Sequence, residues 1–354
     1  GTEWCLATIC PYKHIYEGLN RFNIVVSCLF LVFLILICLI CTLTVRKITQ
    51  PLKNFTLSTV SIAEGNFNTC LPPIRSKDEM QELHSAFSKM QKKLSSYMQN
   101  LERTTAVKEK MESELRIAHD IQMSMLPKDF PSFPGYPHVE LYGVIHPARQ
   151  VGGDFYDFFL LGDDLYFAIG DVSGKGIPAS LLMSYTISLL RSFSFKPTSP
   201  SEIARFLNNR ITERNENDLF VTFFIGVLNL KTGALNYCNA GHMPPVITYP
   251  DRTCSFFDIQ ADLPLGILAD HSYPEYSYHF SPGSGILLYT DGVTEAENKE
   301  GAFYTKERLL QIIHRNREQH PREFIKEIMK DIQSHVQAYE QSDDLTLFTL
   351  IYGE

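Results

Sequence analysis

Aspartates beside small residues, at the ends of apolar segments, are the groups in this sequence whose type and spacing could do chemistry. Four sites share this setting, and five side chains form them: Asp154, Asp171, Asp291, Asp343 and Asp344. An ionised carboxylate is costly to bury without a partner, and four such sites on one sheet would repel one another unless a cation joined them. Mg²⁺ and Mn²⁺ prefer oxygen ligands. A single Asp-Gly after a strand is most often a turn, but the whole series predicts a divalent metal site.

Charge and cysteine content argue against other kinds of site. The 354 residues include 32 basic and 40 acidic ones, which gives a net charge of −8. This balance argues against a protein that holds nucleic acid by bulk attraction. The eight cysteines form neither a zinc-site pattern nor a disulfide scaffold. With 44% hydrophobic residues the chain can build a packed core, so we expect at least one folded domain.

The elements that must position the aspartates follow Pro127, where a series of prolines prevents a helix from continuing. Five apolar segments are typical of strands: 139–144, 164–169, 220–230, 285–289 and 345–352. Four periodic segments are typical of helices: 178–193, 200–214, 305–316 and 321–339. Because strands and helices come in blocks, we expect an α+β domain over residues 127–354, with β-sheets flanked by helices.

An uncharged apolar stretch occupies residues 22–45, and about 20 such residues are enough to cross a bilayer. We interpret it as a transmembrane helix. The alternatives are a signal peptide and a buried core helix, but the stretch is long for a signal sequence and no small-residue cleavage site follows it. Arg46 and Lys47 bias the C-terminal side slightly toward the cytoplasm. Residues 1–21 are then expected to be the tail of an extracytoplasmic sensor region.

Two helical patterns follow the apolar stretch. The first runs from Ile48 to Ile62, and the second keeps a three–four spacing of apolar residues from Met80 to Met125. A heptad pattern of this length predicts a two-stranded coiled coil and therefore a homodimer. Polar Thr104, Lys108 and Gln122 fall on its seam, which is consistent either with a switch or with an imperfect spacer helix.

The region around residues 46–98 resembles a HAMP domain, the parallel four-helix relay of bacterial membrane receptors. The resemblance rests on Pro51, on the connector Glu64-Gly65-Asn66 and on Asp78-Glu79 at the start of the second helix. HAMP domains act between a sensor outside the cell and an effector inside it. The resemblance therefore implies a bacterial inner-membrane protein with a single span over 22–45, a coiled-coil linker over 99–126 and a cytoplasmic effector.

The effector resembles the metal-dependent serine/threonine phosphatases of type 2C, in the bacterial branch of the stress regulator RsbU and the sporulation phosphatase SpoIIE. The resemblance covers residues 114–354 and rests on motifs in the family's order: Glu114–Pro127, Val151–Asp157, Gly170–Gly176, Asn239–His242, Leu288–Gly292 and Asp343–Thr346. It implies a type-2C β-sandwich flanked by helices. It also implies a two-metal centre of Mn²⁺ or Mg²⁺ that hydrolyses phosphoserine without a covalent enzyme intermediate.

By motif position, the resemblance assigns roles to individual residues. Asp154 and Asp171 would bridge or flank the two ions as the catalytic centre, and the Val172 backbone carbonyl would be an added ligand. Asp291 and Asp343 would complete the cage, with Asp344 sharing or replacing the role of Asp343. Asp157 is expected to lie behind these ligands.

Two further side chains are candidates for handling the substrate. Arg149 stands where eukaryotic relatives keep a phosphate-binding arginine, and a guanidinium suits bidentate phosphate recognition; the alternative is an exposed or structural arginine. Those relatives also have an acidic residue where this chain has Gly153, so their metal shell does not transfer in detail. His242 could protonate the leaving serine oxygen, although Asn239–His242 is typical of a tight turn that a histidine stabilises.

Three other signals lead to no function. Gly152-Gly153-Asp154 is followed by Phe155-Tyr156 and not by the Glu-Phe of a diguanylate cyclase. No ATP-lid motif follows His119 as in a histidine kinase. Gly170–Gly176 does not have the spacing of a P-loop.

The apolar stretch, the heptad pattern and the two resemblances together predict a membrane-anchored, dimeric signal transducer. Its cytoplasmic domain is expected to dephosphorylate serine or threonine on a protein. The resemblance implies that the substrate is a phosphorylated anti-anti-sigma factor of the STAS class. We hypothesise that the last turns of the helix ending at Met125 order helix 178–193 and the Asp171 loop. A catalytically silent phosphoprotein-binding module and a phosphatase of small phosphoesters are the alternatives.

Overall fold

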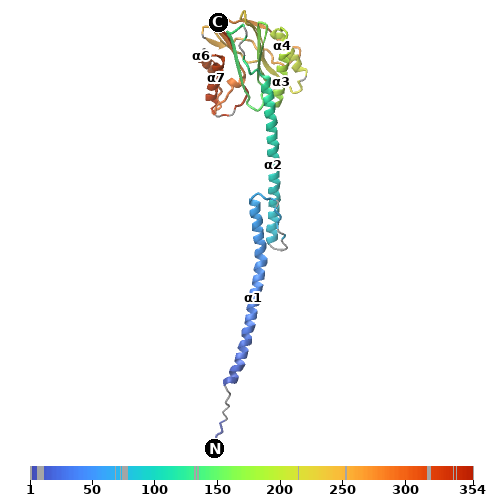
Figure 1. Ribbon diagram of the computed structural model, residues 1–354, viewed down its shortest axis with the longest axis vertical. Helices are drawn as coiled ribbons and strands as arrows, with labels where there is room; N and C mark the ends of the chain where they lie inside the picture. Colours follow the sequence, from blue (N-terminus) through green and yellow to red (C-terminus); the bar gives the residue numbers. More distant parts are fainter. Residues whose placement is uncertain are drawn as a thin grey trace. The chain divides into compact units, whose positions relative to one another are not determined.

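The computed structural model describes most of the chain (Figure 1). The described residues are 2–5, 12–67, 69–71, 73, 79–130, 133, 135–213, 215–251, 253–316, 320–337, 339 and 341–353. They divide into two compact units, Gly1–Glu109 and Lys110–Glu354. Part of the expected sensor tail, and Asp78 of the HAMP motif, lie outside the described residues.

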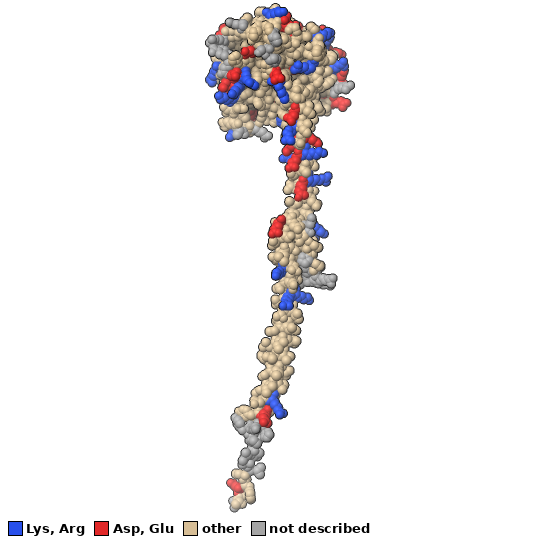
Figure 2. Space-filling view, viewed as in Figure 1, with Lys and Arg blue, Asp and Glu red and all other residues tan. Residues whose placement is uncertain are grey.

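The first unit contains α1 (Tyr12–Ala63) and the first part of α2 (Glu79–Met125). No charged residue lies between Arg21 and Arg46, and the visible face of α1 has a correspondingly long uncharged stretch in Figure 2. Among the described helices, α1 alone is long and apolar enough to cross a membrane. The predicted boundary between the membrane span and the HAMP domain, at residues 45 and 46, lies inside α1. The helix continues without interruption through Pro51.

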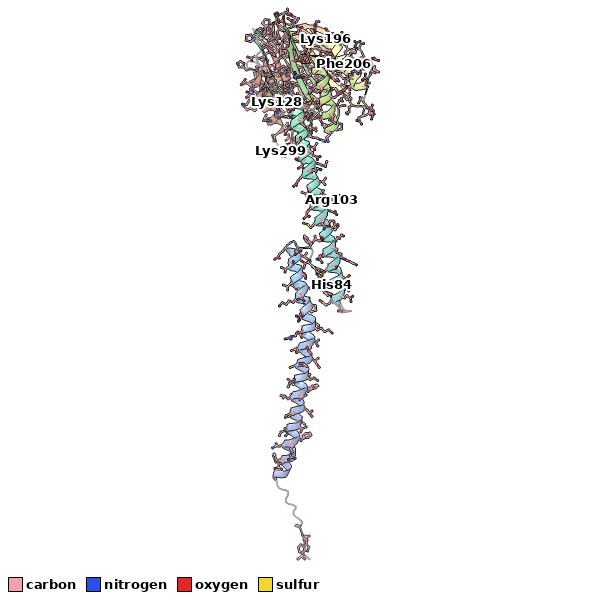
Figure 3. All side chains as sticks on the ribbon, turned by 45° about the vertical axis from the view of Figure 1, so that its right-hand side comes forward. His84, Arg103, Lys128, Lys196, Phe206 and Lys299 are labelled. Atoms are coloured by element: carbon pink, nitrogen blue, oxygen red, sulfur yellow. The ribbon has the colours of Figure 1, made fainter. Side chains whose placement is uncertain are left out.

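The end of α1 packs against the start of α2. The rings of Phe55 and Phe87 lie 4.8 Å apart, and the ring of His84, labelled in Figure 3, lies 6.5 Å from that of Phe55. The Gln91 side-chain amide donates hydrogen bonds to the carbonyl oxygens of Phe67 and Thr69, at 2.8 and 2.6 Å. The Gln91 side chain of α2 therefore holds part of the connector between the two helices.

The second unit is built on two antiparallel five-stranded sheets. The first sheet has the order β1-β10-β9-β6-β7 and the second has the order β2-β3-β4-β5-β8. The strands of the first sheet are β1 (Val139–His146), β10 (Leu345–Tyr352), β9 (Ser284–Tyr289), β6 (Val246–Thr248) and β7 (Cys254–Phe256). Those of the second are β2 (Phe155–Leu161), β3 (Asp164–Val172), β4 (Val221–Asn229), β5 (Ala234–Ala240) and β8 (Tyr276–His279).

Helices cover both outer faces of this sandwich (Figure 1). The second sheet packs on α3 (Ile177–Arg191) and α4 (Pro200–Thr212) through one apolar cluster. The first sheet packs on α6 (Lys306–Asn316) and α7 (Pro321–Val336) through another. A third cluster fills the space between the sheets, and the one-turn α5 (Asp291–Thr294) follows β9. The predicted α+β sandwich flanked by helices is confirmed.

The elements that the sequence prediction omitted are short or interrupted. β2 begins directly after Asp154, because Phe155 and Phe159 are buried on the α3 side of the second sheet and Phe158 faces the other sheet. This stretch is not among the strands predicted from the sequence, because Asp157 interrupts its apolar pattern. β5 was missed because it ends in the turn at Asn239–His242, whose glycine dominates the local pattern.

Candidate metal centre

Asp154 directly precedes β2, lies where the two sheets meet, and is 1% exposed. One of its carboxylate oxygens accepts hydrogen bonds from the hydroxyls of Thr290 and Thr346, each at 2.6 Å. Thr346 lies in β10 of the opposite sheet, and Thr290 directly follows β9 of that sheet. Burial, and next the charge of Asp171, raise the pKa of Asp154 well above its ordinary value, while the two hydroxyls oppose that rise.

Asp344 fixes the loop that carries Asp154. Its oxygens accept the backbone N–H groups of Ala148 at 2.8 Å and of Gly153 at 2.7 Å. The loop passes so close that a Cβ on Gly152 would lie 2.2 Å from an Asp344 oxygen, and a Cβ on Gly292 would lie 1.9 Å from the Asp344 carbonyl oxygen. Gly152 and Gly292 are therefore needed at these positions, because a side chain on either residue would collide with Asp344.

Three more of the predicted aspartates lie around Asp154. Burial, and next the charge of Asp291, raise the pKa of Asp171 at the end of β3 to about 7. Burial, and next the charge of Asp343, raise the pKa of Asp291 at the start of α5. Each of these carboxylates raises the pKa of a neighbouring one through charge repulsion. The fold therefore brings the separate motifs together in one cluster of negative charge.

Lys175 is the cation that the described residues place on this cluster. Its ammonium lies 2.8 Å from an Asp343 carboxylate oxygen and donates to the Ser342 carbonyl oxygen at 2.7 Å. Both side chains are more than a third exposed, so water screens the pair. One half-exposed lysine does not neutralise the carboxylates that lie deeper.

The donor set suits hard divalent ions. Carboxylate oxygens crowd together here with their pKa values raised, and the Val172 carbonyl oxygen faces the same loop, 2.9 Å from where a Cβ on Gly153 would lie. Within the described part of the chain no three His, Cys, Asp or Glu side chains form a ready-made cage. Mg²⁺ and Mn²⁺ keep several waters when they bind, so an incomplete protein shell still suits them.

The other candidate residues lie around this cluster in different ways. Arg149 is exposed in the loop before Asp154, and its expected contact with phosphate stays a prediction. Asp157 lies in β2 and pairs with Arg191 of α3, while burial raises its pKa to about 6 despite that cation. Asp157 therefore lies behind the cluster, on the α3 side.

His242 has no hydrogen-bonding atom left for a substrate. Its Nε2 donates to the Tyr289 carbonyl oxygen at 3.1 Å, and its Nδ1 accepts from the Thr222 hydroxyl at 2.9 Å. Burial lowers its pKa to about 4, so the ring is neutral at pH 7. This geometry fits the structural role: His242 joins β4 of one sheet to the end of β9 in the other.

Sequence reasoning missed the residues that hold the aspartates in place. Thr290 directly precedes Asp291 and Thr346 follows Asp344 by two residues, and this closeness in the motifs was their one available signal. Gln122 was read as a polar residue on a coiled-coil seam. In the structure it is 5% exposed and pairs with Gly152 in both directions, donating to the carbonyl oxygen at 2.7 Å and accepting from the N–H at 3.2 Å.

The end of α2 thus contacts the loop that precedes Asp154. His119, one turn earlier, donates from Nδ1 to the Gln150 carbonyl oxygen at 2.6 Å. The Gln122 amide also lies 3.4 Å from the Met183 sulfur of α3. The sequence analysis predicts that the last turns of α2 order α3 and the Asp171 loop. In the structure these turns contact α3 and the loop before Asp154.

Comparison with known proteins identifies both units. Residues 162–352 match the Stage II sporulation protein E (SpoIIE) family, and residues 43–96 match the HAMP domain. The chain is 30% identical to the phosphoserine phosphatase RsbU of Bacillus subtilis over 245 residues, which are 69% of this chain and 71% of RsbU. It is 28% identical to protein IcfG of Synechocystis over 98% of this chain, which spans 58% of IcfG.

Solved structures agree with this fold. The SiaA-PP2C domain of Pseudomonas aeruginosa superposes with a TM-score of 0.61, at 17% identity, over 70% of this chain and 99% of that domain. At this identity the likeness concerns the fold alone. Together with the sequence matches, it means that the chain belongs to the SpoIIE/RsbU branch of the metal-dependent, type-2C protein serine/threonine phosphatases and carries a HAMP domain ahead of its phosphatase domain.

Proposed function

We propose that this phosphatase is a membrane-anchored, dimeric signal transducer that removes phosphate from serine on a STAS-type anti-anti-sigma factor in a partner-switching pathway. The observation that carries the proposal is the cluster of carboxylates around Asp154 and Asp171, whose pKa values are raised by burial and by one another. Such a cluster is stable with its charges ionised when divalent cations join them.

In this proposal Asp154 and Asp171 hold two divalent ions, Mn²⁺ or Mg²⁺, with Asp291, Asp343 and the Val172 carbonyl oxygen. When bound, the ions supply a water of lowered pKa and Lewis-acid contacts to phosphate oxygens. Asp344 positions the Asp154 loop, because its oxygens already accept backbone N–H groups. Arg149 is the candidate to contact the substrate phosphate from the exposed side of that loop.

The substrate assignment rests on the relatives. RsbU and RsbP of Bacillus subtilis are both named phosphoserine phosphatases, and both match this chain. The wider resemblance to their branch adds the STAS domain as the protein that carries the phosphoserine. Serine on a folded regulatory protein is therefore the first substrate to test, ahead of free phosphoserine.

The arrangement in the membrane rests on α1 and on the HAMP match. We assign residues 1–21 to an extracytoplasmic tail, 22–45 to the membrane span, 46–98 to the HAMP domain, 99–126 to the coiled-coil linker and 127–354 to the cytoplasmic phosphatase domain. HAMP domains are parallel four-helix relays, so two copies of this chain would complete one. The proposed dimer follows from that count of helices.

The test uses the full chain in detergent micelles. Phosphate release from a serine-phosphorylated STAS protein is measured with Mn²⁺, with Mg²⁺ and with a chelator, for the unaltered protein and for Asp291→Asn. The exposed Asp258→Asn, in the loop after β7, makes the same change away from the cluster. We expect turnover that needs metal, is lost in Asp291→Asn and persists in Asp258→Asn.

Two results would contradict parts of the proposal. Turnover of free phosphoserine that exceeds turnover of the phosphoprotein would refute a protein substrate. Binding of the phosphoprotein without release of phosphate, in the presence of either metal, would refute the proposed substrate and favour a tethering role toward it.

A further inference from the structure

Lys175 is a cation at the rim of the carboxylate cluster. Its ammonium lies 2.8 Å from an Asp343 carboxylate oxygen. Burial, and next the charge of Asp343, raise the pKa of Asp291, and the charge of Lys175 opposes that rise. Lys175 therefore acts on two of the candidate metal ligands, one in the loop before β10 and one at the start of α5.

The backbone on both sides of Lys175 is set by the loop that follows β3. The Ser173 N–H donates to the Phe220 carbonyl oxygen at 2.8 Å, and the Ser173 Oγ accepts from the Phe220 N–H at 2.8 Å. Gly174 and Gly176 have φ angles of 85° and 78°, in the left-handed region that favours glycine, so the chain turns on each side of Lys175. The lysine therefore lies in a tight loop whose base is fixed to the residue before β4.

The Lys175 side chain keeps hydrogen-bonding capacity for a ligand. An ammonium has three N–H donors. One donates to the Ser342 carbonyl oxygen at 2.7 Å and a second to Asp343, and among the described residues there is no third acceptor. The side chain is 41% exposed, and the first turn of α3, which follows directly, contains no acidic residue. One N–H therefore remains for an acceptor that comes from solution.

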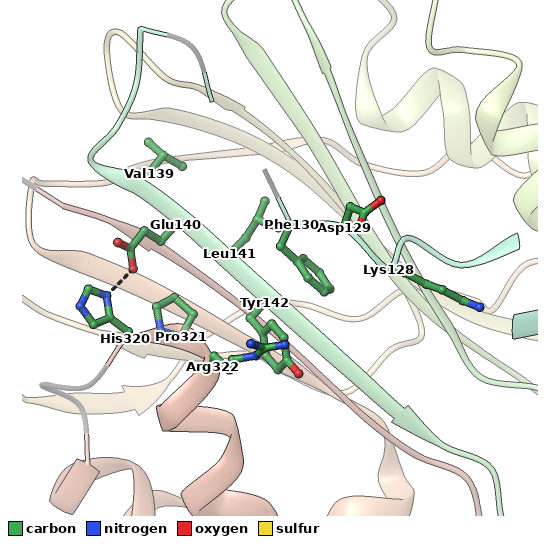
Figure 4. A pocket seen from close by; sticks show the side chains of 10 residues that line it. All are labelled: Lys128, Asp129, Phe130, Val139, Glu140, Leu141, Tyr142, His320, Pro321 and Arg322. Carbon is green, nitrogen blue, oxygen red and sulfur yellow. Dashed lines mark hydrogen bonds and ion pairs between the residues drawn. The ribbon is translucent and has the colours of Figure 1, made fainter. Parts of the chain in front are cut away.

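Basic side chains elsewhere on the domain are engaged away from the cluster. A hollow of about 510 Å³ lies between β1 and α7, and none of the clustered aspartates lines it (Figure 4). In this hollow His320 pairs with Glu140 at 2.9 Å. The Arg322 guanidinium lies 5.4 Å from the centre of the Tyr142 ring. Lys175, by contrast, is bonded to a candidate metal ligand.

The contact with Asp343 is by itself a weak use of the Lys175 ammonium. Both side chains are more than a third exposed, so water screens the pair and the pair adds little to stability. Divalent ions held by the cluster also compete with Lys175 for the charge of Asp343. A substrate phosphate brings new negative charge to the same place, and charge-assisted hydrogen bonds to phosphate are among the strong ones.

We propose that Lys175 is a further catalytic residue, whose ammonium donates a hydrogen bond to a phosphate oxygen of the substrate while Asp343 keeps it at the centre. The inference rests on the proposed function, which brings the phosphate of the substrate to this centre. A lysine carries a compact charge on a flexible four-carbon stem, so the ammonium can reach the phosphate without movement of the backbone. Lys175 then contacts the phosphate from the loop after β3, and Arg149 is the candidate on the loop before β2.

The test measures the binding of Mn²⁺ and of inorganic phosphate separately, on the full-length protein in detergent micelles. Calorimetric titration gives first the affinity for Mn²⁺ and then the affinity of the Mn²⁺-loaded protein for inorganic phosphate. For Lys175→Gln we expect phosphate to bind about tenfold more weakly, the loss expected for a charged hydrogen bond in a half-exposed position. The affinity for Mn²⁺ should stay the same or rise, because the variant removes a cation from the cluster.

Lys231→Gln is the matched control. Lys231 is also an exposed lysine bonded to a carboxylate, at 2.6 Å from Asp163, but that pair lies beside the start of β3 and Asp171 lies near its end. This control should keep both affinities. Lys175→Arg retains a cation that binds phosphate, so it should keep the affinity for phosphate within about threefold.

Two results would overturn the proposal. One is an unchanged affinity for phosphate in Lys175→Gln. The other is an equal loss of Mn²⁺ and phosphate affinity in that variant, because Lys175 would then only hold the ligand loops together. The proposed function fails by a different result, the absence of metal-dependent turnover of the phosphoprotein by the unaltered protein, and the phosphate titration decides the role of Lys175 without turnover. A chain that binds no Mn²⁺ would refute both.

Discussion

At the scale of single residues, two side chains bond one sheet of the phosphatase domain to the other beside the candidate metal centre. Asp154 of the second sheet accepts from Thr290 and Thr346 of the first, and His242 bridges Thr222 and Tyr289. These bonds join groups that are buried or, at Thr222, partly buried, where a lost partner costs more than on a surface. Small polar substitutions at these positions should therefore have measurable effects on both folding and metal binding.

Thr346→Val keeps the shape of the side chain and removes one of the two hydroxyls on Asp154. We expect a loss of about 1–3 kcal/mol in the free energy of unfolding, because the buried carboxylate keeps only one hydroxyl donor. We also expect Mn²⁺ to bind about tenfold or more weakly, as when an outer partner of a metal ligand is removed. Calorimetric titration with Mn²⁺ and thermal unfolding measure the two effects.

Thr349→Val is the matched control for that substitution. Thr349 lies on the same strand, is buried and donates to the Ile286 carbonyl oxygen at 3.1 Å, away from Asp154. It should lose stability and keep its affinity for Mn²⁺. Equal losses of Mn²⁺ affinity in both variants would show that Thr346 has no particular role at Asp154.

His242 predicts a dependence of stability on pH. Its pKa is about 4 in the folded protein, against 6.5 for an ordinary histidine, so between these values the unfolded chain holds the additional proton. The stabilisation is complete above pH 6.5 and is lost as the pH falls toward 4, by about 2 kcal/mol at pH 5. Thermal unfolding in chelator should show this loss in the unaltered protein and a flatter profile in His242→Gln. The exposed His279→Gln should keep the original profile, and equal slopes in all three would contradict the assignment.

At the scale of elements, the last turns of α2 hold the loop that leads into β2. Gln122 replaces two hydrogen bonds that the Gly152 backbone would otherwise make with water, and Asp344 holds the same loop from the other side. A loop fastened at both edges cannot shift without breaking one of these contacts. Movement of α2 relative to the sandwich is therefore expected to change the position of Asp154.

Gln122→Leu should reduce turnover about tenfold on the phosphoprotein and on para-nitrophenyl phosphate alike, because two buried groups of Gly152 lose their partners at a cost of about 1–3 kcal/mol. Steady-state kinetics on both substrates measures this. Gln99→Leu, on an exposed position of the same helix, should leave both activities unchanged. Full activity of Gln122→Leu would mean that α2 merely contacts the loop and does not hold it.

The sequence predicted the elements whose patterns are long and periodic, and the aspartates that stand in motifs. The strand β10 is a continuous apolar run and the helix α7 repeats its apolar residues at helical spacing, so the extent of both elements could be predicted. The partners of Asp154 could not, because a hydroxyl has no periodic signal and lies 136 or 192 residues away in the chain. The same holds for Lys175 and Gln122, whose roles depend on which loops the topology brings together.

At the scale of the whole molecule, the chain combines a HAMP domain, one long helix that belongs to both units, and a phosphatase domain. Lys108→Leu would make the predicted coiled-coil seam of α2 more apolar. We expect basal phosphatase activity to change by about threefold or more if the seam participates in signalling, because apolar seam residues stabilise one register. The matched change Lys110→Leu, off the seam, should have no such effect. Unchanged basal activity and unchanged response to signal in Lys108→Leu would mean that α2 is only a spacer between the two domains.

The order of strands in the first sheet also has a consequence for biosynthesis. β10 lies between β1 and β9, although the ribosome makes it after every other described strand. Asp343, Asp344 and Thr346 arrive with it, so the emerging polypeptide has two open sheet edges and no complete ligand set until this strand is inserted. A premature stop codon or a proteolytic cut shortly before residue 343 would therefore leave a folding intermediate that is both inactive and prone to aggregate, rather than a partly working enzyme.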